Sequence, residues 1–306
     1  MTIVVAGATG LIGQRIVQRL VEAQNEVVVL TRNLSQRIRV NAASVRFVQW
    51  DARTPGDWCT QLGRADAVIN LSGESIGRRR WTSAQKTRIL SSRVNATNAI
   101  VDAIGASRRR PQVLVNASAV GFYGDAGDED VLESHPSGND FLADVCRQSE
   151  SAARAAERYG LRVVLPRSAV VLDAHAGALK KFLLPFRLFV GGPLGSGRQW
   201  FPWIHLEDEV GAILFVIENP TMTGPVNVVA PELVTMREFS SALGRALRHP
   251  SWAPVPAFLL KIALGEMSDM VLKGQRTIPR RLLDAGYRFR FPRLDEALLD
   301  LLKDQN

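Results

Sequence analysis

The first thirteen residues constrain the fold more than any other stretch of the chain. Residues 2–6 are mostly β-branched and apolar, which is typical of a buried strand. Gly7, Gly10 and Gly13 follow at a spacing of three residues, and apolar residues then recur at helical spacing. A strand, a glycine-rich turn and a helix form the context in which this glycine pattern indicates a dinucleotide-binding site.

Each glycine of this turn has a separate expected task. The first permits a tight turn, the second lets the backbone approach a pyrophosphate, and the third lets the helix pack on the strand. The pyrophosphate then lies at the helix N-terminus, where free N–H groups and the helix dipole favour an anion. The predicted cofactor contacts in this turn are Gly7, Thr9, Gly10, Leu11, Ile12 and Gly13.

Strand and helix patterns alternate over the first 165 residues. After the first strand, apolar runs predict strands at 26–30, 45–49, 67–71, 113–117 and 161–165. Longer amphipathic segments predict helices at about 83–104 and 140–158. This alternation predicts an α/β fold, a Rossmann-type doubly wound parallel sheet. Because such sheets bind ligands at the C-terminal ends of their strands, the residues that follow the strands are the site candidates.

The pattern changes after Pro166. Proline and glycine become frequent as far as Pro202, and the later predicted elements are mixed. They are helices near 208–218, 236–247, 256–264 and 294–302, and a strand at 225–229. We expect a dinucleotide-binding domain at 1–165 and a smaller mixed substrate lobe at 166–306, with some of its strands returning to the main sheet.

The residues after the second and third strands predict which dinucleotide binds. In this fold an acid after the second strand binds the 2′-hydroxyl of NAD, whereas an arginine accommodates the 2′-phosphate of NADP. Thr31 and Arg32 stand there without an acid, so we predict that NADP(H) is favoured over NAD(H). Asp51, after the third strand, either bonds the adenine amino group or forms an exposed turn.

Charge, cysteine content and hydropathy exclude several classes of function. The net charge of +8 comes from scattered arginine runs without interleaved aromatic residues, so we expect solvated faces and no nucleic-acid partner. No apolar run approaches the ~20 residues that span a bilayer, and we expect no membrane partner. Cys59 and Cys146 lack a partner motif, so we expect reduced thiols and no metal site. Because the first strand begins at residue 2, we expect no signal peptide. Together with the reduced thiols, this predicts a cytoplasmic protein. The expected partner is a small-molecule substrate. The oligomeric state stays open.

Further motifs along the chain carry a resemblance to a known superfamily. They include Asn70-Leu71-Ser72-Gly73-Glu74, Arg80-Trp81, Ser118 to Gly124, Gly191 to Gly197, Trp203 to Asp208, Gly224 to Asn227 and Gly274-Gln275-Arg276. With them the chain resembles the extended short-chain dehydrogenase/reductase superfamily. More narrowly, it resembles the NAD-dependent epimerase/dehydratase branch, also called sugar-nucleotide-epimerase-like proteins.

The resemblance covers nearly the whole chain and implies a Rossmann domain, a nicotinamide cofactor and a substrate lobe. It implies that Leu71, Ser72 and Gly73 contact the cofactor. It also implies that Glu74 and Arg198 contact the substrate, Arg198 through an anionic group such as a diphosphate.

The chain departs from the superfamily at the acid–base device. That device is a Tyr with a Lys four residues later, in which the Lys lowers the Tyr pKa and holds the nicotinamide ribose. Alignment to Glu150 places the pair at Phe141/Val145 or at Leu142/Cys146, and neither register supplies it. The tyrosines Tyr123, Tyr159 and Tyr287 are not followed by a Lys at that spacing either.

Other polar residues are the candidates for the chemistry. Ser118 matches the catalytic Ser/Thr of the superfamily, and Tyr123 on the same loop is the predicted substitute proton donor. His205 either contacts the substrate or fixes the loop before the next helix, for which Asp208 is the predicted N-cap.

Two functions of different classes fit this pattern. The first is an NADP(H)-dependent epimerase/reductase-like enzyme that acts on a small carbonyl or nucleotide-sugar-type substrate with substitute acid–base groups. The second is a non-catalytic NADP(H)-bound sensor or interaction protein, which the missing Tyr and Lys favour.

Overall fold

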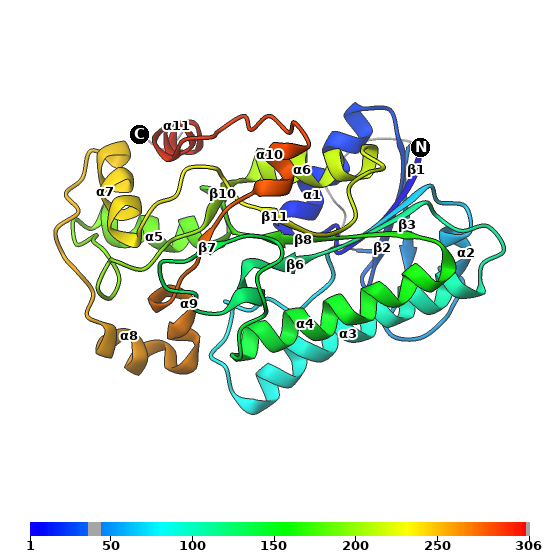
Figure 1. The fold of residues 1–306 in the computed structure, drawn as a ribbon, viewed down its shortest axis with the longest axis horizontal. Coiled ribbons are helices and arrows are strands. Elements are labelled where there is room, and N and C mark those ends of the chain that lie inside the picture. Colours follow the sequence, from blue (N-terminus) through cyan, green and yellow to red (C-terminus); the bar gives the residue numbers. More distant parts are fainter. Residues whose placement is uncertain (36–43, 304–306) are drawn as a thin grey trace.

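A central parallel sheet organises the computed structural model, which describes residues 1–35 and 44–303. The strands lie in the order β11-β8-β5-β4-β1-β2-β3, and β6 pairs with β8 (Figure 1). Their bounds are β1 Thr2–Ala6, β2 Glu26–Thr31, β3 Val45–Gln49, β4 Ala67–Asn70, β5 Val113–Asn116, β6 Ser118–Ala119, β8 Arg162–Ser168 and β11 Gly224–Val228. This confirms the Rossmann-type doubly wound sheet that the sequence predicts.

The strand order reverses beside β1. The chain runs from β1 to β2 and β3 on one side, then crosses to β4, β5 and β8 on the other. In the register, Ala6 at the end of β1 lies opposite Leu30 on one side and Asn70 on the other. The C-terminal ends of β1 and β4 therefore form the switch point, which is where an open α/β sheet binds its ligand.

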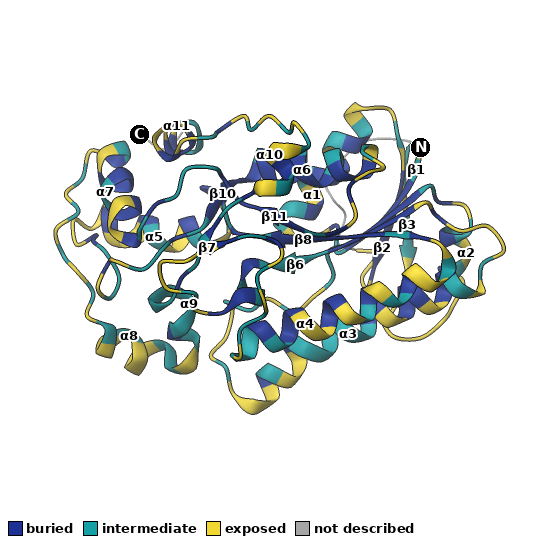
Figure 2. Ribbon diagram, viewed as in Figure 1, coloured by how far each residue is buried: buried dark blue, intermediate teal, exposed yellow. Residues whose placement is uncertain are grey.

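Alternate residues of β1 enter two different hydrophobic cores. Ile3 and Val5 pack with the helices α1 (Leu11–Glu22) and α6 (Leu206–Glu218). Val4 and Ala6 pack on the opposite face, where the helices are α2 (Cys59–Leu62), α3 (Ser83–Ala106) and α4 (Phe141–Arg154). Because both faces are covered, the central strands β4 and β5 are buried throughout their length (Figure 2).

A third core lies in the C-terminal part, around Phe186, Trp203 and Phe239. Around it are α5 (Gly177–Arg187), α7 (Met236–Leu247) and α11 (Leu294–Leu302). The small strand pairs are β9 (Val170–Leu172) with β10 (Trp203–His205), and β7 (Asp130–Val131) with β12 (Arg276–Thr277). The remaining helices are η1 (Val120–Tyr123), η2 (Ala155–Tyr159), α8 (Ala257–Leu264), η3 (Gly265–Ser268), α9 (Asp269–Leu272) and α10 (Arg280–Asp284). No described helix combines the length and the hydropathy needed to cross a bilayer.

The N-cap of α6 differs from the expectation. His205, not Asp208, caps the helix, and its imidazole accepts a hydrogen bond from the backbone N–H of Glu207. The Asp208 carboxylate instead accepts from the backbone N–H groups of Arg290 and Phe291, at 2.7 and 2.8 Å. Asp208 therefore anchors the segment before α11, a contact across more than eighty residues that local pattern does not show.

Candidate functional site

The glycine turn after β1 has the shape that a pyrophosphate requires. Gly7 has a φ of +78°, and a Cβ there would lie 2.6 Å from the Leu71 backbone. A Cβ on Gly13 would lie 2.5 Å from the Gly7 carbonyl oxygen. By contrast, a Cβ on Gly10 would meet only that carbonyl oxygen, at 3.4 Å. The outer glycines are thus packed against backbone, and the middle one opens onto the space that a ligand would fill.

The N-terminus of α1 faces the same space. Gly10 is its N-cap, and within the described residues no side chain caps it. The first turn contains no acid, and Thr9 beside it is exposed. The first N–H groups of the helix are therefore left for an anion, and these residues fit the phosphates of a dinucleotide.

The ends of β2 and β3 carry the residues expected at the adenosine. The Thr31 hydroxyl is buried in a turn with the backbone of Asn33, while Arg32 is exposed. Asp51 is exposed and accepts hydrogen bonds from Thr54 and from the Arg53 backbone, which lower its pKa to about 2. Asp51 forms the turn that was one of its two expected roles, and its contact with adenine stays a prediction.

A buried amide network joins the ends of β4 and β5. Asn70 Nδ2 donates to Asn116 Oδ1 at 2.7 Å, and the Thr97 hydroxyl of α3 donates to the same oxygen at 3.0 Å. Asn70 Oδ1 in turn accepts from the Ser72 backbone at 3.1 Å. This network shapes the Leu71-Ser72-Gly73 loop. Sequence analysis missed it because a contact between side chains 46 residues apart leaves no local pattern.

Ser118 is held by a buried ion pair. Its hydroxyl donates to Glu150 Oε1 of α4 at 2.6 Å. The guanidinium of Arg167, on β8, binds both oxygens of that carboxylate at 2.9 and 2.8 Å. Glu150 and Arg167 are 4% and 3% exposed. Because Ser118 gives its only proton to Glu150, it offers lone pairs, not a donor, to a ligand.

The structure does not support the expected role of Tyr123. Its side chain is 2% exposed, and its hydroxyl donates to Asn227 Oδ1 and accepts from Arg167 Nη1 at 2.9 Å. Burial raises its pKa to about 12, although Arg167 opposes the shift. The hydroxyl uses its proton on Asn227 and accepts from Arg167, so it is not placed to exchange a proton with a substrate. Tyr123 instead stabilises the Ser118 loop.

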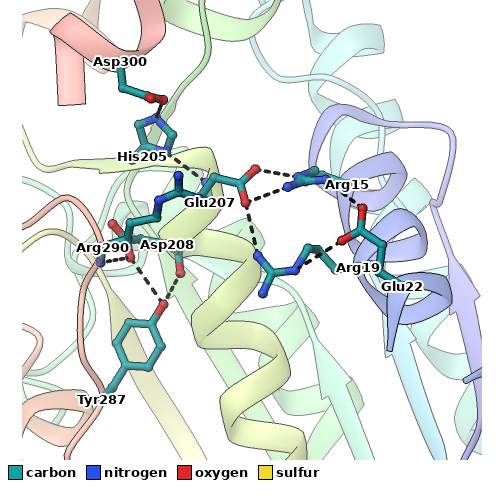
Figure 3. Close-up of polar contacts among 9 residues, drawn as sticks. All are labelled: Arg15, Arg19, Glu22, His205, Glu207, Asp208, Tyr287, Arg290 and Asp300. Atoms are coloured by element: carbon teal, nitrogen blue, oxygen red, sulfur yellow. Dashed lines mark hydrogen bonds and ion pairs between the residues drawn. The ribbon is translucent and has the colours of Figure 1, made fainter. Parts of the chain in front are cut away.

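His205, the last residue of β10 and the N-cap of α6, lies beside Asp300 of α11 (Figure 3). Its ring stacks on Phe291 with centroids 3.9 Å apart, and Nε2 lies 3.4 Å from Asp300 Oδ2. Burial lowers its pKa, against the opposing charge of Asp300. The expected substrate contact does not fit this enclosed ring, whereas fixing the loop before α6 does.

The other two predicted substrate residues lie in different settings. Glu74 follows β4, and α3 holds its backbone: its N–H donates to Ser92 Oγ and its carbonyl accepts from Arg93. Arg198 is exposed on the loop between α5 and β10. The structure therefore brings Glu74 to the C-terminal ends of the strands. Among the described residues, it shows no hydrogen bond between the Arg198 side chain and Glu74.

An ion-pair cluster couples α1 to the C-terminal part. Glu207, in the first turn of α6, accepts from Arg15 and Arg19 of α1 (Figure 3). Arg15 Nη2 lies 2.9 Å and Arg19 Nη1 3.2 Å from Glu207 Oε2. Burial opposes ionisation, yet the arginines lower the Glu207 pKa. The helix that would bind the pyrophosphate is thus tied to α6.

Comparison with known proteins identifies the family. The profile of the NAD-dependent epimerase/dehydratase family matches residues 3–229, most of the chain. The chain belongs to this family. A domain of unknown function (DUF1731) matches residues 255–301.

Relatives within the epimerase family extend over the whole chain. The chloroplastic SDR39U1 homolog of Arabidopsis thaliana is 41% identical over 305 residues, covering 99% of this chain and 87% of that protein. The human epimerase family protein SDR39U1 (isoform 2), crystallised with NADPH, has a TM-score of 0.87 and 33% identity, covering 99% of this chain and 100% of that one. Bacillus cereus UDP-glucuronic acid 4-epimerase, solved with UDP-glucuronic acid and NAD, has a TM-score of 0.80 at 14% identity over both full chains, and shows a shared fold alone. The family resemblance of the sequence is confirmed.

One of the two registers left open for the superfamily pair faces the Ser118 loop. Cys146 Sγ lies 3.8 Å from the Ala119 carbonyl oxygen, and Leu142 packs beside Gly121, so this register faces the Ser118 loop. Phe141 instead packs edge-to-face on Trp81. Burial raises the Cys146 pKa to about 11, so the thiol is neutral. The positions that face Ser118 thus hold an apolar side chain and an uncharged thiol.

Proposed function

We propose that this epimerase-family protein binds NADP(H) along the C-terminal edge of its sheet and acts on a small carbonyl or nucleotide-sugar-type substrate. One observation carries the proposal: the open turn at Gly10 faces an uncapped helix N-terminus, and Arg32 is exposed after β2 with no acid beside it. That the human relative holds NADPH supports the choice of cofactor.

The remaining cofactor contacts belong to the same proposal. They are Gly7, Thr9, Leu11, Ile12, Gly13, Thr31, Asp51, Leu71, Ser72 and Gly73. Glu74 and Arg198 are the proposed substrate contacts, and residues 166–306 form the proposed substrate lobe. When bound, the cofactor supplies hydride exchange at a carbon of the substrate.

Ser118 sets the polarity of the substrate group that it meets. With its proton given to Glu150, Ser118 Oγ accepts a hydrogen bond from a ligand hydroxyl. Arg167 holds the Glu150 carboxylate in place, so the serine keeps this orientation. We therefore propose that the alcohol form of the substrate binds here better than the carbonyl form.

A second candidate is a non-catalytic, NADP(H)-bound sensor or interaction protein. The observation that favours it is that Leu142 and the neutral Cys146 thiol, one of the two registers expected for the Tyr and Lys, face the Ser118 loop. The enclosed hydroxyl of Tyr123 removes the nearest substitute. Such a protein would bind the cofactor without turnover.

An assay of both directions separates the two candidates. Protein purified without added ligand is examined by native mass spectrometry, and then tested for NADPH oxidation with carbonyl compounds and nucleotide sugars. The matching alcohols are tested for NADP⁺ reduction. Turnover that Ser118→Ala loses supports the enzyme. Cofactor binding without turnover across the panel supports the sensor, and failure to bind NADPH contradicts both.

A further inference from the structure

Helix α8 exposes an apolar face that the described part of the chain does not cover. It contains no buried residue, and in Figure 2 it shows no dark blue. Phe258, Leu259 and Ile262 are among its exposed side chains, and Ile262 is 70% exposed. A short helix gains most of its stability from packing an apolar face, so this face is expected to have a partner.

A second exposed apolar segment adjoins the chain that leads into α8. Leu184, Leu188, Phe189 and Val190 lie at the end of α5 and in the turn that follows. Trp252, 67% exposed, donates from Nε1 to the Phe189 carbonyl oxygen at 3.0 Å. The Ala253 backbone N–H donates to Gly191. Two segments distant in sequence therefore form one surface.

We call the eight exposed side chains on these segments the apolar end surface. They are Leu184, Leu188, Phe189, Val190, Trp252, Phe258, Leu259 and Ile262. They make up most of the large hydrophobic side chains that are exposed in residues 1–35 and 44–303. In Figure 1, α5 and α8 lie at the end of the molecule opposite α2 and β3. Such clustering marks an interaction site, because apolar side chains on a soluble surface are usually scattered.

The segments that carry this surface are positively charged, and Glu266, the first acid after α8, is paired with Lys86. The segments 174–206 and 239–265, which contain all eight side chains, include no Asp or Glu. They include the exposed Lys180, Lys181, Arg187 and Lys261. A second copy of the chain, docked through the same face, would bring these cations together. The charge pattern therefore favours an anionic partner over self-association.

In contrast to the sequence-based expectation of no membrane partner, we propose that the apolar end surface docks on an anionic lipid bilayer. Exposed Trp, Phe, Leu and Ile side chains beside lysines are the composition of helices that lie in the headgroup region. Lys261 stands between Leu259 and Ile262 on α8, where its long side chain reaches the lipid phosphates while its stem stays apolar. The docked helix lies in the interface and does not cross it. The proposal is independent of the cofactor and of turnover.

Vesicle co-sedimentation of the full chain tests the proposal. The vesicles are equimolar phosphatidylglycerol and phosphatidylcholine, or phosphatidylcholine alone. We expect binding to the anionic vesicles and a loss of at least about tenfold in Phe258→Ser/Ile262→Ser, because two apolar side chains leave the interface. Lys261→Glu should weaken binding at low salt, and the matched control Leu299→Ser, 61% exposed on the acidic helix α11, should not.

Several results would overturn it. They are absence of binding to the anionic vesicles, equal binding to phosphatidylcholine, or equal loss in Leu299→Ser. Circular dichroism verifies that each variant is folded. Self-association that Phe258→Ser/Ile262→Ser abolishes, without vesicle binding, would assign the surface to a second copy, and retention only by an acidic protein would assign it to a protein partner.

Discussion

The Tyr123 hydroxyl lies 2.9 Å from Arg167 Nη1, within the hydrogen-bond network that also positions Ser118. Arg167 connects them, since it binds Tyr123 and the Glu150 carboxylate that accepts the Ser118 proton. Asn227, on β11, completes the network by accepting from Tyr123 and donating to the Val131 and Ile278 carbonyls. The Ser118 hydroxyl is therefore positioned by a network that includes the buried hydroxyl of Tyr123.

Tyr123→Phe should reduce stability and leave chemistry largely unchanged. The substitution leaves Arg167 Nη1 and Asn227 Oδ1 each without one buried partner, which costs about 1–3 kcal/mol. Urea unfolding measures that loss. Any NADPH-dependent turnover should change less than about threefold, whereas a fall of ~100-fold or more would return Tyr123 to the role of proton donor.

Much of the fold follows from local pattern, but little of the network does. Apolar runs and the glycine turn predict β1, β2 and α1 because strand and helix periodicity is a property of neighbouring residues. Asn227 and Tyr123 are 104 residues apart, and Glu150 and Arg167 are 17 apart. Their polarity alone suggests exposed positions. The sequence shows that neither expected register holds the Tyr–Lys pair. It does not show what replaces the pair, because that depends on how α4 packs on the Ser118 loop.

Restoring the superfamily pair in the register that faces Ser118 should create activity. In Leu142→Tyr/Cys146→Lys, the new phenol and ammonium would stand beside the Ala119–Gly121 backbone. We expect carbonyl reduction by NADPH to rise by ~100-fold or more, which is the usual contribution of a positioned acid. The matched control is Phe141→Tyr/Val145→Lys. It should gain nothing and lose stability, because Val145 is buried and a lysine there has no partner. Equal activity in both variants would contradict the register.

Stability should depend on the protonation of Glu209. This carboxyl is buried on α6, accepts from Ser168 at 2.6 Å, and burial raises its pKa from 4.5 to about 7. The folded state therefore holds a proton that the unfolded state loses first, so stability falls as pH rises from about 4.5 to about 7.

Glu209→Gln should remove that dependence. The amide oxygen keeps the Ser168 bond, so the variant gains unfolding free energy relative to wild type at pH 8 but not at pH 5. The gain is at most roughly 3 kcal/mol. Glu218→Gln, exposed on the same helix, is the control and should show no such change. Thermal or urea unfolding at the two pH values decides, and parallel curves for wild type and Glu209→Gln would contradict the account.

The two glycine positions of the turn should separate binding from folding. Gly10→Val places its side chain in the open space beyond the turn, so the protein should fold and lose the cofactor. Gly13→Val would drive a side chain into the Gly7 and Ala8 backbone, and should destabilise the fold itself. Calorimetric titration with NADPH, with circular dichroism as the fold control, distinguishes them. Retained micromolar affinity in Gly10→Val would exclude this turn as the pyrophosphate site.

Titration of wild type and Arg32→Ala with NADPH and NADH tests the central claim, that the edge of this sheet binds NADP(H). Arg32 is exposed directly after β2, where it would pair with the 2′-phosphate. A charge-assisted contact of about 1.5–3 kcal/mol corresponds to roughly ten- to a hundredfold in affinity. The account predicts that wild type prefers NADPH by that factor and that Arg32→Ala loses NADPH affinity while keeping its NADH affinity. Equal losses for both cofactors, or no preference in wild type, would contradict it.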